Sequence, residues 1–330
     1  MIYYGAAFMN DRPTASIVMV ASAGEMSVRH ILSVLRAQNI ANELEIVISA
    51  RENAVAELSQ IESSPFFDIQ VVTGDFTTSA RARVPAVLEA RGDIIIFCED
   101  HCFPTSDDWA EKIITPLAFD HAAVGPTIEN SNPNSAMSWA NLLIEYGPWV
   151  GNTKSEQQAF IPGHNSCYKT AELLSYGDQL GEMLEVEWVL HRDLVRKGKT
   201  LWVTAEAACE HLNFSLFRQS VLLHFFEGWS FAASRALEWN APRRLTYGFL
   251  WPAIFLIRFW RVMGMLIDLP ISRSLKLKCV FATALLLQIS ALGEGFGYLL
   301  GEQKVRKWLG HMEYERWKNI RPDEARAFYT

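Results

Sequence analysis

The stretch GDIIIFCEDHCFP, residues 92–104, decides the fold class and contains the first candidate site. Residues 94–97 are four apolar residues in a row, which is typical of a short strand buried on both faces of a parallel sheet. One cysteine later come Glu99, Asp100 and His101, whose side chains can all bind a metal ion. The stretch therefore predicts a buried strand that ends in a polar cluster.

Strand-like and helix-like segments alternate around this stretch. Apolar runs at residues 15–20, 44–49 and 67–72 predict buried strands, whereas residues 27–38 and 79–91 are typical of helices. This alternation predicts an α/β fold of Rossmann-like type, in which helices flank a mostly parallel sheet. Because such sheets bind ligands beyond the carboxyl ends of their strands, we expect the polar cluster at the ligand edge.

Composition excludes several classes of protein. The 330 residues, half of them apolar, can bury a sizeable core and favour more than one structural unit. The net charge of -7 gives no overall positive surface, so nucleic acid is not an expected partner. The five cysteines lack the paired spacings of zinc modules and disulfide frameworks, and the N-terminal sequence lacks the basic start of a secretory signal. We therefore expect reduced thiols, no signal peptide and a cytoplasmic setting.

Two apolar stretches dominate the last third of the chain. Residues 249–269 and 279–300 each approach the ~20 residues that span a bilayer. Arg258, Arg261 and Glu294 would be costly at the bilayer centre unless they are paired, and the basic link between the stretches opposes a simple hairpin. We therefore expect helices that lie in the membrane interface or pack on one another. A buried helical subdomain in a soluble oligomer is the alternative.

These patterns predict three regions: a tail at residues 1–12, an α/β domain at residues 13–215, and a helical, membrane-associated region at residues 216–330. Residues 301–330 are rich in Lys, Arg, Glu and Trp. We expect them to form a polar amphipathic helix with a solvated end.

Two more candidate clusters follow the central stretch. In residues 181–198, GEMLEVEWVLHRDLVRKG, Glu187 belongs to a helical pattern and Glu185 lies near its start. The helix dipole alone favours a carboxylate there, so a structural role is the alternative for both. His211 follows a predicted strand at residues 199–207, and a lone histidine is more often structural than a ligand.

A capping role is the alternative for the carboxylates of the central stretch. Asp107 or Asp108 already offers a cap for the next helix, so capping leaves Glu99, Asp100 and His101 unexplained. We therefore favour a metal site that holds Mg²⁺ or Mn²⁺ together with phosphate oxygens.

In this order, the segments resemble the inverting nucleotide-sugar glycosyltransferases of family 2, which have the GT-A fold. The resemblance spans roughly residues 13–211. The D-x-D motif of the family falls on Glu99, Asp100 and His101, and the segment that precedes it appears as ARVPAVLEARGD, residues 82–93. The resemblance implies that Asp100 and His101 contact the metal and the diphosphate, with Glu99 toward the nucleotide sugar.

The acceptor motif of the family falls on EVEWVLHRDLVRKG, residues 185–198. Glu187 takes the place of the catalytic base and Val186 that of the usual preceding acid, which leaves Glu185 as a rival base. His211 matches a histidine that closes the metal site in many members. The loop PGHNSCYKTAELL is similar to the acceptor-side loop of the family, which implies that the pocket is lined by Gly163, His164 and Asn165.

Nucleotide contacts are implied near the ends of the first strands. Ala21 and Ser22 follow the first strand, and Glu52 stands near the place of an aspartate that often contacts the base or ribose. Arg83 is a phosphate or structural contact, with a solvated helix face as the alternative.

The resemblance implies a single displacement with inversion of the anomeric carbon. Glu187 would accept the proton of an attacking hydroxyl while the metal stabilises the leaving nucleoside diphosphate. The apolar C-terminal third suggests a lipid-linked or polysaccharide acceptor at the cytoplasmic face of a membrane, and leaves a homo-oligomer open.

Two other functions remain as alternatives. A nicotinamide dehydrogenase is disfavoured because ASAGEM, after the first strand, has one glycine where G-x-G-x-x-G is expected. The altered acidic motifs would also suit a non-catalytic, membrane-peripheral protein that binds nucleotide sugars or acts as a scaffold.

Overall fold

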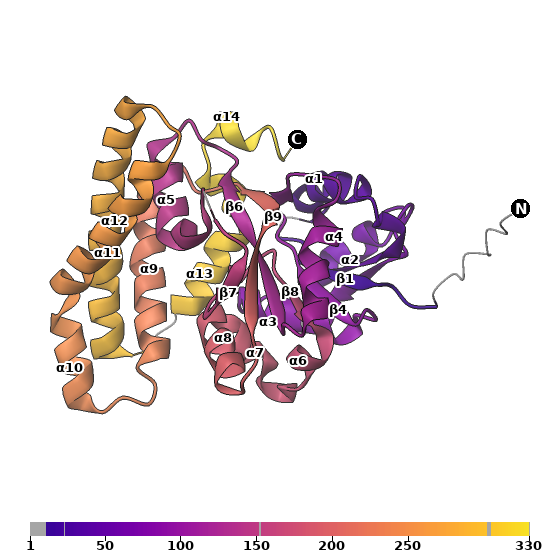
Figure 1. Cartoon of the computed structure of the whole chain (residues 1–330), viewed down its shortest axis with the longest axis horizontal. Coiled ribbons are helices and arrows are strands. Elements are labelled where there is room, and N and C mark those ends of the chain that lie inside the picture. Colours follow the sequence, from indigo (N-terminus) through magenta and orange to yellow (C-terminus); the bar gives the residue numbers. More distant parts are fainter. Residues whose placement is uncertain (1–10, 23, 152, 302–304, 330) are drawn as a thin grey trace, which may run out of the picture.

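The computed structural model describes residues 11–22, 24–151, 153–301 and 305–329. A nine-stranded sheet runs through the α/β part in the order β3-β2-β1-β4-β8-β6-β9-β5, and β7 pairs with β9 (Figure 1). The predicted α/β class, with a mostly parallel sheet flanked by helices, is confirmed. Of the predicted tail at residues 1–12, residues 1–10 lie outside the described part.

The first four strands along the chain form a fully parallel half-sheet. β1 lies between β2 and β4, and β3 lies outside β2. Ile17, Ile46 and Ile96 form one row across this half, and all three are fully buried, as the continuous apolar runs predict. These strands are β1 (Ala15–Val20), β2 (Leu44–Ala50), β3 (Asp68–Thr73) and β4 (Ile94–Phe97).

The other half of the sheet is mixed. β8 is antiparallel to β4 and β6, β9 is parallel to β6, and β5 is antiparallel to β9. The pairing of β5 with β9 sets Cys102 opposite His211, so the segment after β4 meets the end of β9. These strands are β5 (Cys102–Pro104), β6 (Ala123–Asn130), β7 (Glu156–Gln158), β8 (Cys167–Lys169) and β9 (Leu201–His211).

Along the chain, helices α1 to α8 are interspersed with the strands of the sheet. α1 buries Val28, Ile31 and Leu35 on one face, at the spacing that predicts a helix. α3, which carries Arg83, begins where the Thr78 side chain accepts a hydrogen bond from the Arg81 backbone. The helices are α1 (Glu25–Arg36), α2 (Glu52–Leu58), α3 (Ser79–Glu89), α4 (Trp109–Ile114), α5 (Ala136–Tyr146), α6 (Thr170–Leu174), α7 (Leu180–Glu185) and α8 (Glu187–Arg196).

Helices α9 to α12 form a layer beside the α/β part, at the left in Figure 1, whereas α13 and α14 lie against the α/β part. α9 and α12 cross at backbone contact, because a methyl group at Gly293 would lie 2.0 Å from the Phe225 carbonyl oxygen. Arg258 donates to Glu294 at 2.6 Å, so these two costly charges are paired. The helices are α9 (Phe217–Arg235), α10 (Ala241–Phe249), α11 (Trp251–Asp268), α12 (Arg273–Leu300), α13 (Val305–Tyr314) and α14 (Pro322–Ala325).

The outer surface of this helical layer is apolar. α12 is long and apolar enough to cross a membrane, and α10 with α11, bent by 58°, passes the same test as a pair. Only 39% of the apolar window of α12 is buried inside the molecule. Trp260, Ile267 and Phe281 are each at least 70% exposed. The helices therefore pack on one another and also present apolar side chains outward.

The predicted solvated end of the chain holds only in part: residues 321–329 are exposed or half-buried, but the residues just before them are buried. Residues 305–314 are helical, but the segment after them returns to the sheet: Arg316 is 6% and Ile320 is 2% exposed. Near the end, Phe328 stacks on Phe103 with 5.0 Å between the ring centroids. Aromatic and aliphatic residues interleave with the charges of this segment, and their burial favours docking. The tail therefore covers the ligand edge beside β5.

Candidate functional site

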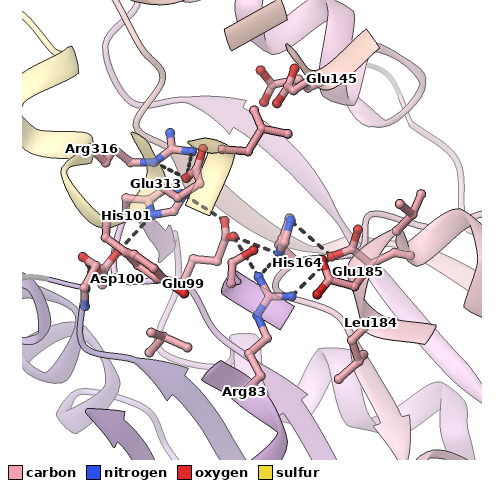
Figure 2. A pocket seen from close by; sticks show the side chains of 18 of the residues that line it. Arg83, Glu99, Asp100, His101, Glu145, His164, Leu184, Glu185, Glu313 and Arg316 are labelled. Atoms are coloured by element: carbon pink, nitrogen blue, oxygen red, sulfur yellow. Dashed lines mark hydrogen bonds and ion pairs between the residues drawn. The ribbon is translucent and has the colours of Figure 1, made fainter. Parts of the chain in front are cut away.

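A cavity of about 320 Å³ opens at the carboxyl ends of β1 and β4 (Figure 2). Its lining comes from the sheet edge, from the region of α7 and α8, and from the C-terminal segments. Among the lining residues are eight of the predicted site residues: Ser22, Arg83, Glu99, Asp100, His101, His164, Glu185 and Glu187.

Glu99, His101 and His211 form a potential metal-binding group. One ligand atom from each lies within 4.8 Å of the others. Within the described part of the chain, Glu99 Oε2, His101 Nε2 and His211 Nε2 are buried and have no hydrogen-bond partner. Glu99 Oε2 and His101 Nε2 are 2.9 Å apart, close enough for an ion pair, but without the geometry of a hydrogen bond. Buried polar atoms are normally satisfied, so three that converge fit a missing cation.

The other nitrogen of each imidazole is already engaged. His211 Nδ1 lies 2.7 Å from Asn213 Oδ1, and Asn213 Nδ2 donates to Asn130, so the histidine nitrogen is the donor. His101 Nδ1 donates in the same way to Asp100 Oδ1 at 2.9 Å. Each Nε2 is then free to offer a lone pair, with a polar group behind the ring as in many metal sites. Asp100 lies behind His101 and outside the converging group.

Without a cation, a proton occupies this group. Burial and Arg316 oppose a charge on His101, but Glu99 and Asp100 outweigh them and raise the pKa of His101 to about 9. Burial alone would raise the pKa of Glu99, yet His101 and His164 hold it well below its usual range. Burial, helped by His101 and Arg316, holds the pKa of His211 well below its usual range. His211 is thus neutral at pH 7, and binding a cation must displace the proton from His101.

Glu187 and Glu185 point to different partners. Val186, which separates α7 from α8, has an extended backbone with φ -139°. Glu187 Oε1 lies 3.3 Å from Arg83 and 3.4 Å from His164 Nε2, whereas the Thr78 hydroxyl donates to Glu185. Of the two rival bases, Glu187 therefore faces the centre of the site.

Glu187 is ionised in this setting. Burial acts to raise its pKa, but the charges of His164 and Arg83 outweigh burial and lower it. Gly163 makes room for the side chain, because a Cβ there would lie 2.3 Å from Glu187 Cγ. An ionised carboxylate is the form that a general base requires.

Arg83 and His164, which lie beside Glu99 in Figure 2, link Glu99 to Glu187. Arg83 lies 3.5 Å from Glu99 as well as 3.3 Å from Glu187, and His164 Nδ1 is 2.8 Å from Glu99 Oε1. Arg83 is 8% exposed, so its alternative placement on a solvated helix face is wrong. Arg83 Nη2 also lies 2.7 Å from His164 Nδ1, so the two side chains together connect the two carboxylates.

The other predicted residues take varied positions. Ala21 is buried beside Ser22, and the Ser22 hydroxyl donates to Asp100. Asn165, with φ 56°, accepts from the Glu99 backbone at 3.4 Å. Glu52 is exposed at the start of α2, and it does not belong to the residues that line the cavity.

The C-terminal segment adds residues that the sequence did not indicate. Arg316 reaches the site from the turn after α13, donates to the Leu212 carbonyl at 3.1 Å and pairs with Glu313 at 2.6 Å. Burial opposes its charge, but Glu313 and Glu99 raise its pKa. In sequence, the spacing of Glu313 and Arg316 resembles an ordinary surface pair on a helix, which gives no signal of burial.

A second cavity of about 990 Å³ adjoins the first. Both are lined by His164 and Glu187, and the second continues along α8, α9 and α11. Its walls are mainly aromatic and aliphatic, and its charged residues are three arginines and four glutamates. The lining includes Trp149, Phe160, Trp188, Phe231, Ile254, Ile257, Arg235, Arg258 and Arg261.

Comparisons with known proteins find a family match in the N-terminal part of the chain. Residues 16–174 match the model of glycosyl transferase family 2. That span contains Arg83, Glu99 and His101 but neither Glu187 nor His211. No curated protein matches the chain.

Among solved structures, the chain is similar to S. aureus TarS 1-349, at 11% identity and a TM-score of 0.43, with 82% of this chain and 70% of that chain covered. The same protein in complex with UDP gives 11% identity and a TM-score of 0.46, covering 82% and 89%. GalNAc-T7 with UDP, GalNAc and Mn²⁺ gives 14% identity and a TM-score of 0.44, covering 62% and 44%.

Proposed function

We propose that this glycosyltransferase moves a sugar from a nucleoside diphosphate sugar in an inverting, metal-dependent reaction. The proposal starts from the match of residues 16–174 to glycosyl transferase family 2. The observation that carries this proposal is the convergence of three buried ligand atoms without a hydrogen-bond partner among the described residues, from Glu99, His101 and His211, where Glu99 and His101 line the cavity that Glu187 also lines. An inverting transfer needs one base and one group that stabilises the leaving diphosphate.

Glu99, His101 and His211 would hold the metal ion. Two imidazole nitrogens and one carboxylate suit a transition-metal ion such as Mn²⁺ better than Mg²⁺, which prefers oxygen ligands. When bound, the ion supplies positive charge to the departing diphosphate. Asp100 fixes the orientation of His101 through Nδ1 and is itself held by Ser22.

Glu187 is the proposed general base. Its carboxylate is ionised, borders both cavities and is positioned by Arg83 and His164. It would remove the proton from the acceptor hydroxyl as that oxygen attacks the anomeric carbon. Glu185 is held by Thr78 at the start of α3 and would have no such role.

The second cavity is the proposed acceptor path. Its apolar walls, the arginines along it and the outward apolar face of α10 to α12 suit a lipid-linked acceptor, or a growing saccharide, at the cytoplasmic face of a membrane. The same outward face would otherwise serve a homo-oligomer.

The test is a panel of UDP-, GDP- and dTDP-sugars incubated with the full chain and either Mn²⁺ or EDTA. We expect one donor to be turned over with Mn²⁺ and not with EDTA, and the product to have an inverted anomeric carbon by NMR. Glu187→Gln should lose about 10²–10⁴-fold in rate, while the matched variant Glu185→Gln keeps most of it. Equal rates in Glu187→Gln and the native chain would overturn the assignment of the base.

A further inference from the structure

A second group of metal-capable side chains lies between α5 and α9. Glu145 comes from the last turn of α5, and His224 and Glu227 lie three residues apart on one face of α9. One ligand atom from each lies within 4.8 Å of the others. Figure 2 shows Glu145 apart from the group around Glu99. This second group is therefore distinct from the proposed donor site.

The hydrogen bonds of Asn141 fix the tautomer of His224. Asn141 Nδ2 donates to the carbonyl oxygens of Met137 and Phe214 and to Ser220, at 2.8 to 3.0 Å. Its Oδ1, 2.7 Å from His224 Nε2, must therefore accept the hydrogen bond. His224 Nε2 carries the proton, and Nδ1 is left with a lone pair.

That lone pair faces another acceptor. His224 is 1% exposed, and its Nδ1 lies 3.3 Å from Glu227 Oε2. Burial raises the pKa of Glu227 to about 8, so in the absence of a cation its protonated carboxyl group can donate to Nδ1. A buried imidazole lone pair in contact with a carboxylate oxygen requires either a proton or a cation between them. A buried histidine nitrogen aimed at a carboxylate is an observation independent of the acidic charge of the group.

A cation accounts for more of the group than a proton does. Without a cation the group needs two protons to become neutral, because burial raises the pKa of both Glu145 and Glu227 to about 8. A cation would satisfy all three ligands at once. Asn141 already orients the imidazole from behind, which is the usual support of a metal-binding histidine.

We propose that Glu145, His224 and Glu227 bind a second divalent transition-metal ion of the Mn²⁺ to Zn²⁺ series. One imidazole nitrogen and two carboxylates suit such an ion and leave open positions for water or a ligand oxygen. Glu145 and Glu227 line both cavities, so the ion would stand where the donor cavity meets the proposed acceptor path. It would also connect α5 to α9, the first of the C-terminal helices.

The experiment counts bound ions in the full chain. Protein stripped with EDTA and dialysed is titrated with Mn²⁺ and, separately, Zn²⁺, and bound metal is measured by EPR or elemental analysis. We expect two ions per native chain, one in Glu227→Gln, one in His101→Gln and none in the double variant. Glu227→Gln keeps the size of the side chain and removes the ligand charge, and circular dichroism checks that each variant folds.

The stoichiometries decide the proposal. A Glu227→Gln chain that binds as many ions as the native chain overturns it, because a proton then resolves the contact with His224. If Glu227→Gln does not fold, Glu145→Gln replaces it, since Glu145 makes no hydrogen bond within the described residues. The second site is supported if Glu227→Gln or Glu145→Gln loses one ion and His101→Gln keeps the ion at the second group. This result does not depend on whether the donor site binds metal.

Discussion

At the scale of single residues, the proton on His101 marks the place of the proposed donor-site cation. The carboxylates of Glu99 and Asp100 raise the pKa of His101 to about 9 against burial and Arg316, so the metal-free ring is charged at pH 7. A cation must displace that proton, and its binding becomes easier as pH rises. The pH dependence of metal binding therefore tests the ligand assignment directly.

We predict that Mn²⁺ affinity at the first group rises by about tenfold per pH unit between pH 6.5 and 8.5 and levels off near pH 9. The measurement is calorimetric titration in buffers of different ionisation enthalpy, which also counts the released proton. Using the Glu227→Gln chain removes the second group from the signal. An affinity independent of pH would contradict His101 as a ligand.

A second prediction at this scale concerns Gly163. A Cβ at this position would lie 2.3 Å from Glu187 Cγ and 2.7 Å from Glu187 Cβ, so Gly163→Ala must displace the proposed base. Because misplacement of a base slows the chemical step, we expect kcat to fall by about 10²-fold with little change in the donor KM. Gly181→Ala is the matched control, since its nearest contact would be 3.6 Å away. Equal losses in both variants would point to instability instead.

At the scale of elements, the parallel half-sheet could be predicted from the sequence, whereas of the mixed half only β9 was indicated. β1, β2 and β4 have continuous apolar runs that identify buried strands, and they delimit the edge where Glu99 lies. β5, β7 and β8 have three residues each, and such short strands carry no periodic signal. The meeting of His101 with His211 depends on the pairing of β5 with β9, so only the resemblance to a family suggested it.

The crossing of α9 and α12 gives a prediction about stability. Gly293→Ala would set a methyl group 2.0 Å from the Phe225 carbonyl oxygen, which forces the helices apart. We expect a loss of about 1–3 kcal/mol in the free energy of unfolding, measured by chemical denaturation. Gly264→Ala on α11 meets no atom within 4 Å and should stabilise by up to about 1 kcal/mol. Destabilisation of similar size in both variants would contradict close packing at the crossing.

At the scale of the whole molecule, the site is completed by segments distant in the sequence. Arg316 lies between α13 and α14, yet its charge acts on His101 and His211. No local pattern announces such a contribution, because the spacing of Glu313 and Arg316 is that of a common exposed pair. Residues after the family 2 span therefore supply the proposed base, one proposed ligand and a buried positive charge to the donor cavity.

The outward apolar face of α10 to α12 leads to the last prediction. Trp260 and Phe281 are 72% and 70% exposed on this face, and basic residues flank it at Arg243, Arg244, Arg273, Lys276 and Lys278. Such a surface should bind vesicles that contain anionic lipid, since each large apolar side chain gains about 1.5–3 kcal/mol on burial. We expect the full chain to float with these vesicles in a density gradient.

The variants for that experiment are Trp260→Ser with Phe281→Ser, against Phe119→Ser. Phe119 is 75% exposed but lies in the α/β part, so its loss should leave flotation unchanged, whereas the double substitution should weaken binding by at least tenfold. A chain that stays monomeric without detergent and never floats would contradict membrane binding. If the chain is instead a dimer and the same double substitution dissociates it, the face serves self-association. Either a membrane or a second copy of the chain would bury these two rings.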